Sequence, residues 1–213
     1  MPERSGLLPC EDRSVYVARV LYPVEVLGPG KRVGIWFCGC PRRCCGCSNP
    51  ELWEFSERCK TAPRYVFELI RYIAKDHPVD GFTITGGDPM YQADELGELI
   101  SLLRSISEDI LVYTGYDLHE LPKDNLRGIA VLIDGEYIER RNTGCVLRGS
   151  DNQKIHILDK NYARKYEEYI SAAKNQIQNF MCADGIVSVG IHKPDFINDL
   201  NKKLTESGLC PNE

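Results

Sequence analysis

The sequence lacks the segments that would carry a protein into or across a membrane. No basic N-terminal region is followed by an apolar run. No stretch of about 18 uninterrupted apolar residues occurs anywhere in the chain, which is the length a membrane-spanning helix needs. We therefore expect neither secretion nor membrane insertion, and we expect the protein to work in the cytoplasm.

Basic runs, repeats and low-complexity tracts are also missing. The net charge is -5, and no run of Lys and Arg is longer than a pair such as Arg42 and Arg43. Nucleic-acid binding is therefore not expected, because it needs a basic patch. The 213 residues are 43% hydrophobic and show no break in composition. They are expected to form a single domain, 1–213, around one core.

Cysteine is abundant, but a second pair of closely spaced cysteines is lacking. In a reducing compartment the ten cysteines are more typical of ligands or core residues than of disulfides. Half of them fall in one short stretch: Cys38, Cys40, Cys44, Cys45 and Cys47. The others are single, whereas a structural zinc site closes four ligands, usually in two C-x2-C pairs.

Three of these cysteines have a spacing that suits an iron–sulfur cluster. Cys40, Cys44 and Cys47 form C-x3-C-x2-C, and on a [4Fe-4S] cluster three protein ligands leave one iron open. Cys45 in place of Cys44 is a competing choice on spacing alone. Cys38 alternates with Cys40 on a predicted strand and is expected to pack inward.

Extended segments alternate with amphipathic helical segments along the chain. Strands are predicted at 14–28, 33–39, 81–87, 109–115, 128–135, 153–158 and 185–192, and helices at 61–78 (with Thr61 as the cap), 92–106, 161–177 and 195–204. This alternation predicts an α/β fold of about five or six parallel βα units. Because so few units cannot close an eightfold barrel, an open, partial (β/α) barrel is expected. Residues 1–30 would form an N-terminal strand and turn, 37–53 the cysteine loop, and 205–213 a frayed tail.

The polar and glycine-rich motifs follow the predicted strands. The cysteines come after VGIWF, GGDP (86–89) after FTIT, TGY after LVY, and DGEY after VLI. Ligands of parallel α/β folds bind at the carboxyl ends of strands, so these motifs should converge. In GGDP the glycines allow close backbone approach to a ligand, and Asp88 can accept hydrogen bonds from an ammonium group.

Together these motifs resemble those of the radical S-adenosylmethionine enzymes. In that family three cysteines hold a [4Fe-4S] cluster, and the open iron is chelated by the amino and carboxylate groups of S-adenosylmethionine. LGPGKRVGIWFCGC (27–40) and CSNPELW (47–53) are similar to the glycyl-radical activases. Gly46 before the third cysteine, and Asp88 where Glu is usual, resemble the subgroup that activates anaerobic ribonucleotide reductase. In this register Cys40, Cys44 and Cys47 are the ligands, and Cys45 stands where a proline is frequent.

The resemblance also implies a set of cofactor-binding residues. The GGDP residues would border the methionyl amino group, and residues from the other motifs are expected to face the cleft as well. The full set is Gly86, Gly87, Asp88, Pro89, Asn49, Thr114, Asp134, Ser150 and Val189. Thr114 and Asp134 fall where the activase of pyruvate formate-lyase places a monovalent cation, but Tyr113 replaces an acidic ligand, which argues against the ion. VGIHKP (189–194), represented by Val189 in this set, falls at the end of the last strand, where the family often has an adenine contact. As metal ligands, the histidines at 119, 156 and 192 are not expected, and they are taken as ordinary polar positions.

The resemblance implies radical chemistry directed at a protein substrate. A flavodoxin or ferredoxin would reduce the cluster, and S-adenosylmethionine would be cleaved to a 5'-deoxyadenosyl radical. A short chain without a second cluster domain would leave an open mouth for a large substrate. This favours activation of a glycyl-radical enzyme, anaerobic ribonucleoside-triphosphate reductase. The alternatives are a stand-alone radical enzyme acting on a peptide or small metabolite, and an iron–sulfur or zinc module without catalysis.

Overall fold

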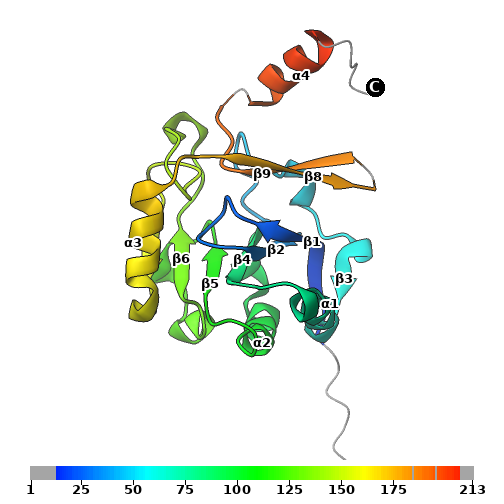
Figure 1. The fold of residues 1–213 in the computed structure, drawn as a ribbon, viewed down its shortest axis with the longest axis vertical. Helices are drawn as coiled ribbons and strands as arrows, with labels where there is room; N and C mark the ends of the chain where they lie inside the picture. The colour runs from blue at the N-terminus through cyan, green and yellow to red at the C-terminus, as the bar shows by residue number, and fades with distance from the viewer. Residues whose placement is uncertain (1–12, 184, 195, 207–213) are drawn as a thin grey trace, which may run out of the picture.

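A seven-stranded mixed sheet organises the chain (Figure 1). The computed structural model describes residues 13–183, 185–194 and 196–206. The sheet order is β3-β1-β2-β4-β5-β6-β7. Its strands are β1 (Val15–Val24), β2 (Arg32–Phe37), β3 (Lys60–Thr61), β4 (Gly81–Gly86), β5 (Ile110–Tyr113), β6 (Val131–Asp134) and β7 (Lys154–Ile157). The adjacent strands β2, β4, β5 and β6 run parallel, and the other three pair antiparallel at the two sides.

Helices α1 (Pro63–Asp76) and α2 (Ala93–Leu103) cover one face of the sheet. On this face Ile35, Ile84 and Val112 are in register on neighbouring strands. They pack against apolar residues that recur at helical spacing in the two helices, such as Ile70 and Leu99. The parallel strands are apolar nearly throughout because both of their faces are buried.

The opposite face is covered by two separate elements. Helix α3 (Ala163–Ala172) places Tyr166 against Leu111 and Ile133 of β5 and β6. The antiparallel hairpin β8 (Ile177–Cys182) and β9 (Gly185–Gly190) places Val189 against Trp36 of β2. Helix α4 (Phe196–Glu206) projects beyond the hairpin, away from the sheet (Figure 1).

A buried ionic network joins α3 to the amino ends of the parallel strands. Arg32 is fully buried, and its guanidinium lies 3.1 Å from Oδ1 of Asp109, itself 1% exposed. Tyr166 donates to the same Oδ1 at 2.7 Å, and Lys165 Nζ lies 2.6 Å from Oδ2. Burial alone would raise the pKa of Asp109, but the charge and hydrogen bonds of its partners hold that pKa below its usual value.

The direction and pairing of several strands differ from the sequence prediction. Among the described residues four strands run parallel, not five or six. The segment 153–158 forms β7, which is antiparallel to β6, because no crossover helix joins the two strands. The segment 185–192 lies in the separate hairpin, whose first strand was not predicted.

The ends of two helices also differ. Thr61 does not cap α1, because it lies in β3, where it pairs with Val15 of β1. Ala62 holds the cap position instead. Of the predicted tail 205–213, Thr205 and Glu206 belong to α4, and the remainder lies outside the described residues. No helix in the described part of the chain is both long and apolar enough to span a membrane.

Candidate metal and cofactor site

A cavity open to solvent lies at the carboxyl ends of the four parallel strands. The space between its walls, including the part open to solvent, is about 990 Å³. The cysteine loop, the strand ends, the loop after β6 and the hairpin all contribute to its lining. Those residues are Leu27, Trp36, Cys40, Arg42, Cys44, Cys47, Ser48, Asn49, Thr85, Gly86, Gly87, Asp88, Tyr113, Thr114, Gly115, Gly135, Tyr137, Gly149, Gln153 and 188–192. The predicted convergence of the four motifs is thus present.

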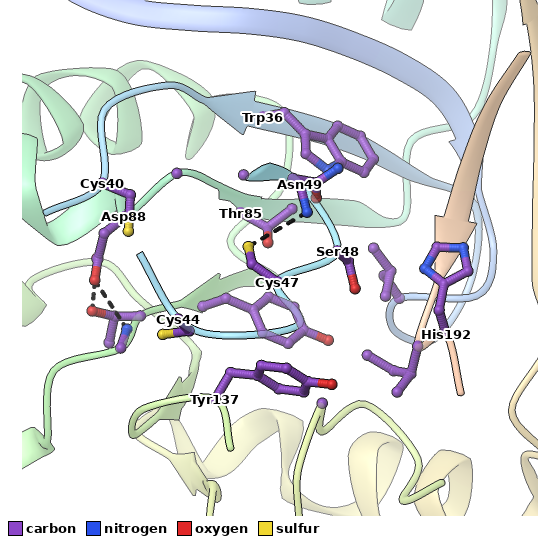
Figure 2. Close-up of a pocket in the computed structure, with 18 of the residues that line it drawn as sticks. Trp36, Cys40, Cys44, Cys47, Ser48, Asn49, Thr85, Asp88, Tyr137 and His192 are labelled. Carbon is purple, nitrogen blue, oxygen red and sulfur yellow. Dashed lines mark hydrogen bonds between the residues drawn. The ribbon is translucent and has the colours of Figure 1, made fainter. Parts of the chain in front are cut away.

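Cys40, Cys44 and Cys47 line this cavity together from one irregular loop (Figure 2). Burial raises the pKa of the Cys40 and Cys44 thiols above their ordinary value. Backbone N–H groups oppose this at both sulfurs, and the Asn49 N–H donates to Cys47 Sγ at 3.4 Å. Amide donors around cysteine sulfurs favour the thiolate and tune iron–sulfur clusters. The loop therefore offers three sulfur ligands; its own backbone supports Cys40 and Cys47, and the backbone of Tyr137 supports Cys44.

A single metal ion and an iron–sulfur cluster need different ligand geometries. A structural zinc site gathers four ligands about 2.0–2.3 Å from one point. A [4Fe-4S] cluster presents a different iron to each cysteine, so its ligands do not have to meet at one point. Within the described ranges, no group of three Cys, His, Asp or Glu side chains is arranged to hold one metal ion.

The two remaining cysteines of the stretch lie elsewhere. Cys45 is exposed, points its thiol to Glu139 Oε2 at 3.7 Å, and is not part of the cavity lining. Cys38 is 1% exposed and packs with Trp36, so its predicted inward position is confirmed. Gly46 has φ +69°, and a Cβ there would lie 2.4 Å from Glu139 Oε1. Glu139 thus fills the space that a larger residue at position 46 would need.

The glycines of GGDP bring the end of β4 against the start of the cysteine loop. Gly86 has φ +105°, and a Cβ on it would lie 2.4 Å from the carbonyl oxygen of Phe37. Gly87 N–H donates to that same oxygen at 2.7 Å, and Asp88 N–H donates to Gly39 O at 3.0 Å. The two motifs are therefore in direct backbone contact, which only residues without a side chain permit.

The Asp88 carboxylate connects three of the loops around the cavity. It is 2% exposed, and Oδ1 accepts from Thr114 Oγ1 at 2.8 Å and from Met90 N at 3.1 Å. Oδ2 accepts from Gly115 N at 3.0 Å (Figure 2) and lies 3.8 Å from Arg42 Nε. Burial raises the pKa of Asp88, and these hydrogen bonds oppose the rise. Its carboxylate lies at the cavity surface with both oxygens bound.

The Arg42 side chain of the cysteine loop contacts residues of the neighbouring loop after β5. Its guanidinium lies over the Tyr116 ring, 4.4 Å from the centroid, and its NH2 group lies 3.8 Å from Glu120. A Cβ on Gly115 would lie 2.4 Å from Arg42 Cδ. Arg43 instead points to solvent, where it pairs with Glu54. The two adjacent arginines therefore differ: Arg42 is built into the site and Arg43 is not.

The other predicted site residues divide between the cavity surface and the layer behind it. Asn49, Thr114 and Val189 line the cavity, Val189 from the hairpin. The lining does not include Pro89, Asp134 or Ser150. Pro89 begins a 3₁₀ turn, Asp134 accepts from Leu118 N at 2.7 Å, and Ser150 accepts from Ile138 N at 3.2 Å. These three hold the loops in place from behind.

Sequence reasoning missed several lining residues. Tyr137 belongs to the DGEY motif, so its position after a strand could have indicated it. Trp36 and Tyr113 lie on strands and also line the cavity. Their position could be predicted only by knowing which face of the sheet α1 and α2 leave uncovered. His192 was expected to be an ordinary polar position, but the hairpin brings it to the cavity.

Comparison with known proteins shows which family the chain is similar to. Residues 26–156 match the family described as a 4Fe-4S single cluster domain. The anaerobic ribonucleoside-triphosphate reductase-activating protein of Enterobacteria phage T4 is 34% identical over 141 residues, covering 63% of this chain and 90% of that protein. The protein of the same name from Vibrio cholerae is 36% identical over 150 residues, covering 63% and 94%. That from Escherichia coli K12 is 30% identical over 149 residues, covering 64% and 96%.

Proposed function

The chain belongs to the family of anaerobic ribonucleoside-triphosphate reductase-activating proteins with a 4Fe-4S single cluster domain, and from this premise we propose that it is a cytoplasmic radical S-adenosylmethionine enzyme. Its reaction would install a glycyl radical on an anaerobic ribonucleoside-triphosphate reductase. The four adjacent parallel strands would form the core of the open, partial (β/α) barrel of that class.

The chemistry comes from the bound groups. Held by Cys40, Cys44 and Cys47, a reduced cluster would supply one electron for reductive cleavage of the C5'–S bond of S-adenosylmethionine, and the resulting 5'-deoxyadenosyl radical would take a hydrogen atom from the reductase glycine and leave methionine as the other product. A flavodoxin or ferredoxin would supply the electron. The protein contributes chelation, orientation and exclusion of water.

The single observation that carries this proposal is the meeting of Cys40, Cys44 and Cys47 with GGDP at one cavity. In our assignment the three thiolates hold the cluster and leave one iron open. The orientation of Cys45 toward Glu139 supports Cys44 as the ligand. The GGDP residues would then border the methionyl amino group of the cofactor.

The remaining predicted residues have graded roles in this proposal. Asn49, Thr114 and Val189 would face the cofactor, since they line the cavity. Pro89, Asp134 and Ser150 would act through the loops that they hold. Asp88 would fix the cysteine loop against the TGY loop, because its carboxylate is shared among their donors.

The deciding experiment measures cofactor cleavage by the reconstituted chain. Wild type, Cys44→Ala and Cys45→Ser are loaded anaerobically with iron and sulfide, reduced with dithionite, and incubated with S-adenosylmethionine. Iron per chain is measured, and 5'-deoxyadenosine is quantified by chromatography. We expect cleavage by wild type and Cys45→Ser, and a loss of at least tenfold in iron-dependent product with Cys44→Ala.

Three results would contradict parts of the proposal. Loss of the cluster in Cys45→Ser but not in Cys44→Ala would reverse the ligand assignment. Zinc in place of iron, with no 5'-deoxyadenosine from wild type, would make the protein a structural metal module. The glycyl radical on added reductase is measured by electron paramagnetic resonance. Cleavage of S-adenosylmethionine without that radical signal would point to a stand-alone radical enzyme.

A further inference from the structure

A second pocket lies at the amino ends of β5 and β6, at the edge of the sheet opposite to the cysteine loop. Three segments form this amino-end pocket: the turn between α2 and β5, the residues that lead into β6, and the residues that follow β7. The space between its walls, including the part open to solvent, is about 910 Å³. It shares no lining residue with the cavity that holds the cysteines.

One part of the amino-end pocket is apolar. Leu126, Ile129, Ala130 and Leu158 belong to its lining. Ile129 and Ala130 are buried, whereas Leu158 is 36% exposed. Leu158 N–H donates to Ala130 O at 2.9 Å, which fixes the residues after β7 against the segment before β6. This apolar surface is therefore held in place, and an apolar group that covered it would remove it from water.

Four cationic side chains belong to the same lining, those of Arg104, Lys123, Arg127 and Lys160. The two arginines already have partners, since Arg104 pairs with Glu108 and Arg127 lies 2.9 Å from Asp124. Within the described residues, the ammonium groups of Lys123 and Lys160 take part in no ion pair or hydrogen bond. Both lysines are exposed, so they are open to an external anion.

The carboxylates of the lining do not pair with these two lysines. Asp159 Oδ1 accepts from Asn161 N at 3.0 Å, and Glu108 pairs with Arg104. Gly128 helps to place Arg104: its φ is +80°, and a Cβ on it would lie 3.0 Å from Arg104 Cδ. The stem of Arg104 thus lies against the backbone of the pocket. Glu108 and Asp159 already have partners of their own, which leaves the lysines for a ligand.

An apolar surface beside two unpaired ammonium groups suits a ligand that has both a ring and phosphates. Phosphate oxygens accept hydrogen bonds from lysine and carry the opposite charge. A nucleobase offers a flat face that can cover Leu158 and its neighbours. Lys123 and Lys160 come from different segments, so a ligand with several phosphates can engage both. A small carboxylate would pair with a lysine but would leave the apolar surface in water.

We propose that the amino-end pocket binds a nucleoside triphosphate, with the phosphates at Lys123 and Lys160 and the base against Leu158. The site is separate from the cofactor cavity, because the two lie at opposite ends of the parallel strands. No residue of the cysteine loop or of GGDP contributes to it. The inference therefore goes beyond the proposed function and does not depend on it.

The test is equilibrium binding to the full, cluster-loaded chain under anaerobic conditions. Isothermal titration calorimetry gives the Kd for ATP, inorganic triphosphate and adenosine at one ionic strength. ATP should bind most tightly, because it alone has both parts, and the other two should bind at least about threefold more weakly. Added salt should weaken ATP binding, since the lysines are exposed.

Two variants separate the charged part of the site from the apolar part. A chain with Lys123→Gln and Lys160→Gln should bind ATP about tenfold more weakly, as expected for the loss of two exposed charge pairs. Leu158→Asn should weaken ATP about threefold but leave the Kd of inorganic triphosphate unchanged, because it removes only apolar contact. The thermal transition is recorded for every variant.

The matched control carries Lys75→Gln and Lys154→Gln. It removes the same charge from two exposed lysines outside the lining, and it should bind ATP within about twofold of wild type. This control separates a local contact from the effect of net charge.

Four results would overturn the proposal. The first is no detectable binding of ATP at millimolar concentrations. The second is equal weakening of ATP binding by the control and by the Lys123 and Lys160 changes, which would leave only net charge. The third is inorganic triphosphate binding as tightly as ATP, which would leave only an anion patch. The fourth is displacement of ATP by S-adenosylhomocysteine, which would place the nucleotide in the cofactor cavity.

Discussion

Gly86 offers the sharpest test of how the site is constructed. The change is Gly86→Ala, which adds one methyl group where the end of β4 touches β2. The added Cβ would lie 2.4 Å from the carbonyl oxygen of Phe37 and 2.6 Å from its nitrogen. Both are backbone atoms of a central strand, so they cannot move away as a side chain could.

Two costs add to give the expected loss of stability. Residue 86 has φ +105°, and holding alanine in such a region costs of order 1–3 kcal/mol. Overpacking against a rigid neighbour typically costs another ~1–3 kcal/mol. The free energy of unfolding should therefore fall by about 2–6 kcal/mol. Since domains are stable by about 5–15 kcal/mol, a weakened fold is expected to remain measurable.

Gly97 supplies the matched control within the same chain. It lies in α2, where an added Cβ would have no atom within 4 Å. Gly97→Ala should raise the free energy of unfolding by about 0.5–1 kcal/mol, because alanine loses less conformational entropy in a helix.

The assay is urea unfolding of the anaerobically purified, metal-free chain, followed by circular dichroism. Iron per chain after reconstitution provides a second readout, and it should fall for Gly86→Ala only. A Gly86→Ala variant within about 0.5 kcal/mol of wild type would refute the reasoning, since the close backbone contact could not then be real. Equal destabilisation by Gly97→Ala would refute it as well.

Two further predictions concern charged groups. Asp109→Asn should lower the free energy of unfolding at pH 7 by roughly 3–5 kcal/mol, because Arg32 is left buried without its carboxylate. The pKa of Asp109 is lower in the folded state, so the stability difference between wild type and Asp109→Asn should have its full size above about pH 4 and shrink as the pH falls further. Urea unfolding at a series of pH values measures this difference. A difference that does not change with pH would contradict the prediction. Arg42→Gln should lower the free energy of unfolding by about 1 kcal/mol and reduce the iron retained per chain. The control Arg43→Gln, at an exposed side chain, should change the free energy of unfolding by less than about 0.5 kcal/mol. Equal effects of the two variants would show that Arg42 is not built into the site.

The parts of the fold that the sequence predicts are those determined locally. The apolar, β-branched and aromatic runs before each motif, and the apolar residues at helical spacing in α1 and α2, depend only on near neighbours, and these elements are confirmed. The direction of β7 depends on what the chain does between β6 and Lys154. That segment contains turns and one short 3₁₀ helix (Glu139–Arg141) but no α-helix that could serve as a crossover, so the strand returns antiparallel. An apolar pattern within β7 cannot report this.

The site shows the same division between local and distant information. The order of motifs along the chain predicts that the cysteines, GGDP, TGY and DGEY meet, since each follows a strand. Trp36 and Tyr113 could not be assigned in this way, because a buried parallel strand is apolar on both faces. His192 depends on where an entire hairpin docks. That position is set by distant contacts such as Gln178 with Pro23 and Asn142 with His192.

Peptide groups hold both ends of the cysteine loop. Gly87 and Asp88 donate to Phe37 and Gly39 immediately before Cys40, and Gly39 N–H donates to Leu52 O at the far end of the loop. Both ends of the loop are thus held by hydrogen bonds to the protein. Small zinc domains differ, because there the metal supplies the folding free energy. Here we expect the sheet and its buried core to supply it, so the loss of iron should remove the chemistry without unfolding the chain.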